Sequence, residues 1–241
     1  MSIETYIPWS EKKEILVILA HPDDPEFFLG GTISRWISEG HAVHYAILTK
    51  GDKGSSDPTL TPAQIIAHRI EEQTAAADFL GVASLEFLDN PDGYLVPDLE
   101  TRKQVVSLIR KYRPQILVTC DPLNLFENRR YINHPDHRAA GQVVIDAAFP
   151  GAGNIFFYPE LVQAGLLPHT VEEIWMSLTG QPNVLVDVTG FFETRLEALK
   201  MHVSQIGDPI AFEERVRSWL EKDTQGNFKY EEKFRRINFT R

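Results

Sequence analysis

Four ionisable side chains stand within six residues in the segment His21-Pro22-Asp23-Asp24-Pro25-Glu26, directly after a short apolar run. Two adjacent carboxylates, here Asp23 and Asp24, raise each other's pKa unless a cation lies beside them. Burying such charged groups at the end of a strand is unfavourable unless they bind something. A metal ion would resolve both problems, so this segment predicts a metal site.

A second group of titratable side chains, His134-Pro135-Asp136-His137, stands at the start of a predicted helix. His21, one histidine of this pair and one aspartate would supply two nitrogens and one oxygen. Three such ligands with an open fourth position describe a catalytic zinc site. The remaining carboxylate can take a proton from metal-activated water, and the remaining histidine can protonate a leaving amine or stabilise an oxyanion. The alternative is that these side chains only cap helices, which leaves the paired histidines unexplained.

Strands and helices in alternation must position the two segments. Short apolar runs predict strands over residues 15–20, 43–49, 85–88 and 116–120. Apolar periodicity and capping signals predict helices over residues 29–39, 61–80, 98–112 and 136–149. This order indicates an α/β fold with a mostly parallel sheet and helices on both faces. Both segments follow strands, so we expect them to meet at the carboxyl edge of the sheet.

The last third of the chain shows a different pattern. Residues 154–158, 172–178 and 183–189 are predicted strands with no helix between them, which indicates an antiparallel extension at the sheet edge. Helices are expected over residues 192–206 and 209–221. Because no linker or repeat interrupts the chain, residues 1–241 are predicted to form one domain.

Composition limits the classes of function. The 241 residues carry a formal net charge of -10, which disfavours nucleic-acid binding because such proteins normally carry a Lys/Arg excess. No stretch approaches the roughly 18 apolar residues of a membrane span. The first residues lack the apolar run of a secretory signal, and the single cysteine, Cys120, allows no internal disulfide. We therefore expect a cytoplasmic protein without nucleic-acid partners and without a membrane span.

As a pair, the two motifs resemble those of the LmbE-like, or PIG-L, family of zinc-dependent N-acetylglucosaminyl deacetylases. Looser matches follow in family order, at Gly30-Gly31-Thr32, Arg69-x-Glu71-Glu72, Pro91-Asp92-Gly93 and His202-x-Ser204-Gln205. The resemblance implies a Rossmann-like fold, bound Zn²⁺ and removal of an N-acyl group, chiefly N-acetyl, from an amino-sugar derivative. The implied partner is a small amino sugar or a glycoconjugate. A homo-oligomer is also compatible, because some relatives form oligomers.

The resemblance also implies roles for individual residues. The implied zinc ligands are His21, Asp24 and His137. The implied catalytic residues are Asp23 as general base, and His134 as the charged partner of the tetrahedral intermediate, oriented by Asp136. Positions that contact the sugar in relatives are matched by Arg69 and Asp92. For His202 we expect a contact with the substrate or with the residues that surround the site.

Two other classes of function compete with this interpretation. A metal-dependent phosphoesterase usually needs two metals ~3.5–4 Å apart, and Glu26 and Asp136 could recruit a second ion. A Rossmann-like nucleotide-binding module is the other alternative. The turn after the first strand lacks the G-x-G-x-x-G pattern, which counts against nucleotide binding.

Overall fold

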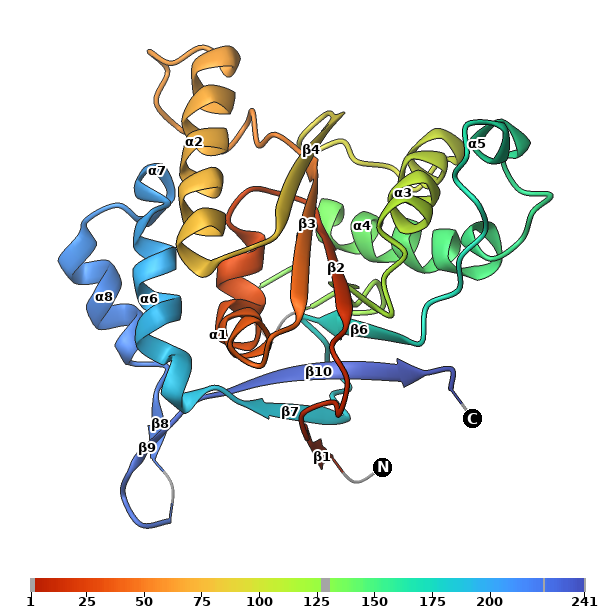
Figure 1. Ribbon diagram of the computed structural model, residues 1–241. Helices are drawn as coiled ribbons and strands as arrows, with labels where there is room; N and C mark the ends of the chain where they lie inside the picture. Colours follow the sequence, from red (N-terminus) through yellow and green to blue (C-terminus); the bar gives the residue numbers. More distant parts are fainter. Residues whose placement is uncertain (1–2, 127–130, 223, 241) are drawn as a thin grey trace.

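The computed structural model describes residues 3–126, 131–222 and 224–240 (Figure 1). Its main sheet has eight strands in the order β1-β7-β10-β6-β5-β2-β3-β4. The parallel part consists of β2 (Glu14–Leu19), β3 (Ala42–Thr49), β4 (Ser84–Asn90), β5 (Ile116–Cys120) and β6 (Glu173–Ser177). The strands expected in the first half of the chain are thus confirmed, with small shifts at their ends.

Each face of the parallel sheet packs against its own hydrophobic cluster. Successive side chains of a strand point to opposite faces. Accordingly, Ile15, Val17 and Leu19 of β2 belong to one cluster, and Leu16 and Ile18 belong to the other. All five side chains are fully buried. Such a continuous apolar strand is typical of parallel sheets that are covered on both sides.

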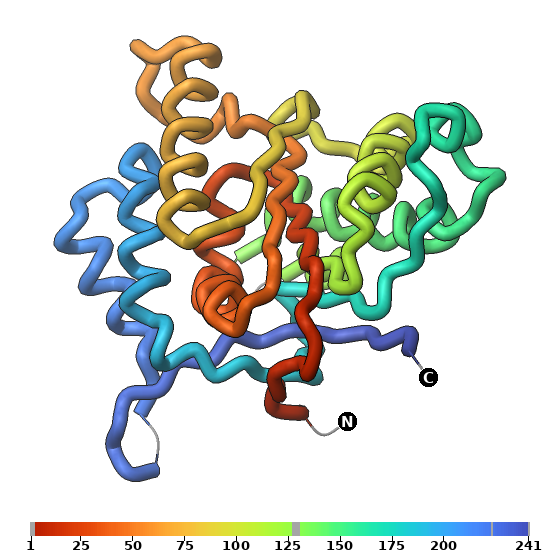
Figure 2. Tube along the Cα trace, in the orientation of Figure 1, coloured from red at the N-terminus to blue at the C-terminus, as the bar shows by residue number. Residues whose placement is uncertain are grey.

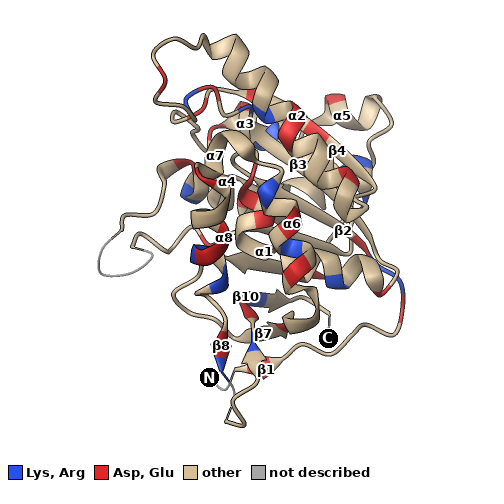
Figure 3. Cartoon of the chain, turned by 90° about the vertical axis from the view of Figure 1, so that its left-hand side faces the viewer, with Lys and Arg blue, Asp and Glu red and all other residues tan. Residues whose placement is uncertain are grey.

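Helices cover both faces of the sheet, as predicted. Helices α1 (Asp24–Ser38) and α2 (Pro62–Leu80) lie on one side, and α3 (Leu99–Tyr112) and α4 (Pro135–Asp146) lie on the other (Figure 1). The predicted capping box opens α2, with reciprocal hydrogen bonds between Thr61 and Gln64. Acidic and basic residues alternate with others along the helices of the α1–α2 side (Figure 3).

The segment after α4 differs from the prediction. The chain continues from α4 into a π-helix (Ala147–Ala152), and residues 154–158 form turns rather than a strand before α5 (Pro159–Gln163). The buried guanidinium of Arg110 explains the difference, because it donates hydrogen bonds to the carbonyls of Gly151, Ala152, Asn154 and Phe157. One side chain therefore satisfies backbone groups that a strand would satisfy through a ladder.

The antiparallel extension is confirmed, but its composition differs from the prediction. Strand β10 (Glu231–Asn238) runs antiparallel between β6 and β7 (Val184–Asp187), and β1 (Glu4–Thr5) adds a parallel edge beside β7. Neither β10 nor β1 was expected. Strand β6 corresponds to the strand predicted over residues 172–178, but it continues the parallel core beside β5 and does not belong to the antiparallel extension. The sequence does not indicate strand β10, because charged residues dominate it and Phe234 is its one fully buried large apolar residue.

The C-terminal helices are shorter than predicted. The single helix expected over residues 192–206 is divided into α6 (Phe192–Lys200) and α7 (Val203–Ile206), and α8 (Pro209–Arg217) precedes a hairpin of β8 (Glu221–Lys222) and β9 (Phe228–Lys229). Both chain ends lie on the side of the molecule that is formed by β1, β7 and β10 (Figure 2). Within the described ranges, no helix combines the length and apolar character needed to cross a bilayer.

Candidate active site

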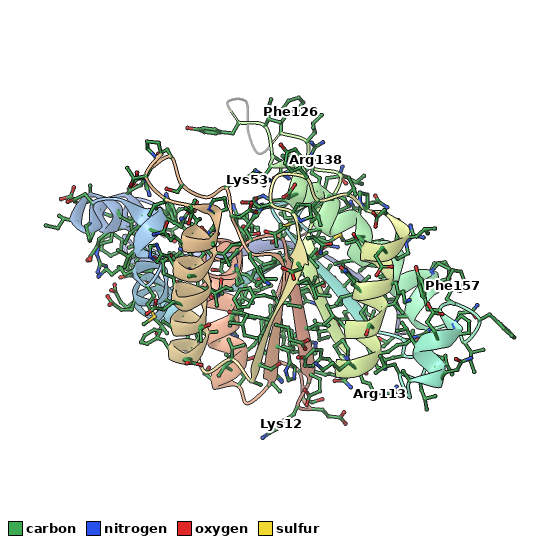
Figure 4. The ribbon with its side chains drawn as sticks, turned by 90° about the horizontal axis from the view of Figure 1, so that it is seen from above. Lys12, Lys53, Arg113, Phe126, Arg138 and Phe157 are labelled. Atoms are coloured by element: carbon green, nitrogen blue, oxygen red, sulfur yellow. The ribbon has the colours of Figure 1, made fainter. Side chains whose placement is uncertain are left out.

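The two motifs meet at the carboxyl edge of the parallel strands. The first follows β2, the second opens α4 after β5, and His21 Nδ1 lies 3.3 Å from His137 Nε2. Figure 4 separates this edge, marked by Lys53 and Arg138, from the opposite edge, marked by Lys12 and Arg113. The expectation that both motifs share one edge of the sheet is therefore confirmed.

The carboxylate of Asp24 is held from behind by the backbone. Its Oδ2 atom accepts hydrogen bonds from the N–H groups of Ala20 (3.1 Å) and His21 (2.9 Å). Its Oδ1 atom lies 3.1 Å from His137 Nε2. Although burial raises the pKa of Asp24, the contacts with His137 and His21 hold it well below its usual range. Asp24 thus offers a negatively charged oxygen to the centre of the site.

Two carboxylates flank the Nε2 atom of the His21 ring. Its Nε2 lies 3.2 Å from Asp92 Oδ1 and 3.2 Å from Asp136 Oδ2, so this nitrogen carries a proton. In the neutral imidazole, which is the form that binds a metal, the lone pair on Nδ1 then faces His137 and Asp24. Although burial lowers the pKa of His21, the hydrogen bonds with Asp136 and Asp24 raise it to about 12. The site therefore strongly favours positive charge at this point.

His137 is oriented in the same manner. Its Nδ1 lies 3.2 Å from Asn133 Oδ1, and a proton donated to that oxygen leaves the Nε2 lone pair facing His21 and Asp24. Carboxylates and carbonyls behind ligating histidines fix the tautomer in this way. Ligands of a tetrahedral zinc ion, at ~2.0–2.2 Å, lie about 3.4 Å from each other. The separations of 3.3 Å and 3.1 Å around His137 Nε2 fit that spacing.

Two other groupings of ligand atoms occur within the described residues: His21 with His134 and His137, and His21 with Asp92 and Asp136. The Nδ1 atom of His134 accepts a hydrogen bond from the N–H of Asp136 (3.2 Å), so its Nε2 carries a proton and cannot ligate. The carboxylate of Asp136 is already occupied by backbone donors. The donor chemistry therefore favours His21, Asp24 and His137 as the metal-binding set.

Asp136 is placed differently from the expectation. Its oxygens accept hydrogen bonds from the N–H groups of Gly93 (2.7 Å) and Leu95 (3.2 Å), and it faces His21. In the described part of the chain, its carboxylate makes no hydrogen bond with His134, which it was expected to orient. The backbone of Asp136 orients His134 instead, and the side chain orients His21.

Asp23 occupies the N-cap position of α1 in a left-handed backbone conformation (φ 91°, ψ -30°). Among the described residues its side chain makes no capping hydrogen bond, so helix capping does not explain it. Its Oδ2 atom instead lies 3.1 Å from Arg69 Nη2. Burial raises the pKa of Asp23 to about 6, against the lowering effect of Arg69.

The two expected sugar contacts, Arg69 and Asp92, are each 5% exposed. Arg69 donates a hydrogen bond to the carbonyl of Pro22, and a Cβ atom at Gly51 or Gly54 would collide with its guanidinium. Those two glycines therefore permit the loop after β3 to close over Arg69. Although burial raises the pKa of Asp92, its hydrogen bond with His21 lowers it to about 2.

The chain matches the family described as PIG-L: GlcNAc-PI de-N-acetylase over residues 16–148. It is 37% identical to the diacetylchitobiose deacetylase of Thermococcus kodakarensis strain KOD1 over 204 residues, which cover 84% of this chain and 74% of that protein. The chain belongs to the PIG-L family. This membership confirms the family and the class of enzyme that the two motifs predicted.

Solved structures of the PIG-L fold agree with this assignment. The N,N'-diacetylchitobiose deacetylase of Pyrococcus horikoshii, in complex with its inhibitor MPG, matches with a TM-score of 0.84 at 30% identity, covering 96% of this chain and 86% of that one. The 4-carboxy-2-hydroxymuconate hydratase GalB of Pseudomonas putida KT2440 matches with a TM-score of 0.75 at 22% identity, covering 95% and 97%. The second match shows a shared fold alone.

Behind the motif of this PIG-L protein lies a buried polar cluster that was not expected. Glu26 accepts hydrogen bonds from Tyr45 Oη (3.2 Å) and Gln73 Nε2 (3.1 Å), and its Oε2 lies 3.1 Å from His202 Nε2. His202 is 1% exposed. Although burial lowers the pKa of His202, its hydrogen bond with Glu26 raises it. This position fits a role through Glu26 better than a direct substrate contact.

A second unexpected feature is a kink in α1 at Leu29, where the backbone leaves helical geometry. Arg195 donates hydrogen bonds to the carbonyls of Glu26 (3.1 Å) and Phe27 (2.7 Å), on one side of the kink. On the other side, Glu232 accepts hydrogen bonds from the N–H groups of Gly31 and Thr32. Arg195 Nε also lies 3.4 Å from Glu232 Oε1. Residues of α6 and β10 thus replace helical hydrogen bonds that the kink removes.

Proposed function

We propose that this PIG-L protein is a zinc-dependent N-deacetylase, with the ion held by His21, Asp24 and His137. The observation that carries the proposal is that one ligand atom from each of these three side chains points to a common centre. The other polar atom of each side chain makes a hydrogen bond that fixes its orientation. Three protein ligands with nitrogen and oxygen donors leave a fourth position for water or substrate, as in catalytic zinc sites. Iron or cobalt would accept the same ligands, so metal analysis forms part of the test.

The proposed chemistry divides between the ion and two side chains. A zinc ion in this site would act as a Lewis acid on the amide carbonyl and would activate a water molecule. The Asp23 carboxylate would accept the proton of that water as general base. His134, whose Nε2 carries a proton, would donate a hydrogen bond to the developing oxyanion. Asp136 would contribute by orienting His21.

For the substrate, we propose an N-acetylglucosamine derivative, either a small amino sugar or a glycoconjugate. The names of the family and of the Thermococcus relative support this class. Arg69 and Asp92 are the proposed sugar contacts. Both already have protein partners, so a sugar hydroxyl would share them with Asp23 and His21.

The test measures metal content and acetate release together, with N-acetylglucosamine and diacetylchitobiose, before and after chelation. About one zinc per chain with chelator-sensitive acetate release is the result that the proposal requires. Zinc without acetate release from any acetamide would refute the proposed reaction and retain the site. Failure to bind metal after reconstitution at neutral pH would refute the site as well.

The structure gives the phosphoesterase alternative little support. Each grouping of ligand atoms within the described ranges contains His21, so no second ligand set stands apart from the first. Two-metal catalysis needs two ions ~3.5–4 Å apart, each with its own ligands. Hydrolysis of phosphoesters but not of acetamides would reverse this preference.

The proposal also includes a cytoplasmic location and a single domain over residues 1–241, and it is compatible with a homo-oligomer. A lone cysteine that is buried at the end of β5 suits a reducing compartment. Cell fractionation tests the location, limited proteolysis tests the domain, and light scattering of the purified chain tests the oligomer.

A further inference from the structure

The backbone of Asp23 adopts a conformation that few residues with a side chain adopt. At φ 91° it lies in the left-handed region, where aspartate is tolerated better than most residues but is still strained. Such strain persists only where the surrounding structure imposes it, and it is frequent at functional sites. The groups that impose this conformation therefore determine where the Asp23 carboxylate points.

One side chain binds the backbone of Asp23 directly. Gln73 Oε1 accepts a hydrogen bond from the N–H of Asp23 at 2.6 Å, and Gln73 is fully buried in α2. One helical turn earlier, Arg69 donates a hydrogen bond to the carbonyl of Pro22. The peptide that joins Pro22 to Asp23 is thus held at its oxygen and at its nitrogen by the same face of α2.

The orientation of the Gln73 amide is fixed by its other end. Its Nε2 lies 3.2 Å and 3.1 Å from the two carboxylate oxygens of Glu26, which can only accept from it. Tyr45 and His202 hold Glu26 in turn. Since the N–H of Asp23 is a donor and the Glu26 carboxylate is an acceptor, only one orientation of the amide satisfies both. A buried network that is satisfied in this way specifies a single arrangement.

We propose that Gln73 is a positioning residue for the deacetylation: it connects the buried Glu26 carboxylate to the backbone of Asp23 and holds the Asp23 carboxylate toward the reacting water. This inference rests on the proposed function, in which Asp23 is the general base. It assigns a function to Glu26 and His202 that does not require either side chain to touch the substrate.

The experiment compares Gln73→Leu with Leu80→Val, a change of a buried apolar residue on the same helix that leaves the network intact. Both variants are tested for zinc content, thermal unfolding, kcat and KM, and the crystal structure of Gln73→Leu is determined. We expect Gln73→Leu to keep one zinc per chain and an unchanged KM, with kcat lowered by about 100-fold, because small misplacements of a catalytic group have effects of that size. The crystal structure should show Asp23 at a negative φ.

The double variant Gln73→Glu/Glu26→Gln exchanges carboxylate and amide. An oxygen at position 73 can still accept the N–H of Asp23, and an amide nitrogen at position 26 can donate to the other oxygen at position 73. The carbonyl oxygen at position 26 can still accept from His202, and the hydroxyl of Tyr45 can turn to accept from the new amide nitrogen. Recovery of most of the kcat that Gln73→Glu alone loses, at the thermal stability of that single variant, supports positioning. A double variant that is no more active than Gln73→Glu counts against it.

Two results would overturn the inference. The first is an unchanged left-handed φ at Asp23 in Gln73→Leu, together with a kcat within twofold of the wild type. The second is a loss of kcat that parallels the loss of thermal stability in both Gln73→Leu and Leu80→Val. If the wild-type protein releases no acetate, the proposed function fails by itself, whereas the conformation of Asp23 in Gln73→Leu still tests the positioning.

Discussion

The two sides of the first turn of α1 differ in whether their hydrogen-bond acceptors receive donors. The side with His21, Asp24 and His137 is called the front, and the side with Glu26, Gln73 and Arg195 is called the back. In front, His21, Asp24 and His137 direct three acceptor atoms at each other, 3.1–3.3 Å apart around His137 Nε2. At the back, the Glu26 carboxylate accepts hydrogen bonds from neighbouring side chains. Arg195 donates hydrogen bonds to the two backbone carbonyls beside the kink. Both regions are buried and charged, but only the front has acceptors that face acceptors.

This difference separates two uses of buried charge. Acceptors that converge need a cation, and each front ligand is fixed from its far side as metal ligands usually are. A network whose acceptors already receive donors needs no ligand, and it instead specifies one backbone arrangement. Changes in front should therefore remove metal or turnover and leave the fold intact. Changes behind should lower the free energy of unfolding, and at Gln73 they should also lower kcat through the placement of Asp23.

The largest effect is expected in front, at Asp23. The variant Asp23→Asn cannot accept a proton, whereas asparagine tolerates the left-handed backbone as well as aspartate does. We expect kcat for acetate release to fall by about 10²–10⁴-fold with one zinc retained per chain. The exposed surface carboxylate of Asp89, changed to Asn, is the control and should leave kcat unchanged. Near-normal turnover of Asp23→Asn would show that another group is the base.

Behind the site, the largest effect is expected at Arg195. The variant Arg195→Leu removes the cationic partner of the buried Glu232 carboxylate and deprives the carbonyls of Glu26 and Phe27 of their donor. Removing one partner of a buried ion pair typically lowers the free energy of unfolding by about 3–5 kcal/mol. Urea denaturation measures this change.

The matched control for Arg195→Leu is Arg217→Leu, which breaks two ion pairs at the surface, with Glu193 and Glu213. Exposed pairs typically contribute about 0–1 kcal/mol. If both arginine variants lose the same small amount of stability, the back of the site is not the rigid support that its contacts indicate.

A smaller effect in front is expected at His134. In His134→Asn, the shorter side chain can still cap α4 by accepting the N–H of Asp136, but it loses the donor at Nε2. We expect kcat to fall by about 10²–10³-fold, as for the loss of one oxyanion donor. The zinc content of the variant decides between the two ligand groupings, since a loss of metal would make His134 a ligand.

The front of the site could be predicted from the sequence because its residues are contiguous in two motifs. Each motif follows a buried strand, and the carboxyl ends of parallel strands meet at one edge. The back could not be predicted in the same way. Gln73 lies in the middle of a regular helix, 50 positions from Asp23, and Arg195 lies 169 positions from Glu26. No local pattern distinguishes these two from solvated helix residues.

The fold shows the same division. Strands such as β2 were predicted because both of their faces are buried in apolar surroundings. Strand β10 was missed because Glu232, one of its inward-facing residues, is charged and serves the kink of α1. The strand expected over residues 154–158 was wrong because Arg110, more than 40 positions away, satisfies its carbonyls. In both of these errors, a polar contact with a residue far along the chain determines the local structure, and the neighbouring sequence does not indicate it.

The smallest effect is expected at the start of α2, the helix that carries both Arg69 and Gln73. The variant Thr61→Ala removes the capping box, whose two partners are exposed. Loss of an N-cap typically lowers the free energy of unfolding by about 1 kcal/mol. The contacts of Arg69 and Gln73 lie more than one turn further along α2, so kcat should not change. Urea denaturation and acetate release measure the two quantities on one preparation. A kcat that falls with this small loss of stability would mean that fraying of α2 reaches Asp23, and the back of the site would then be a mobile support rather than a fixed one.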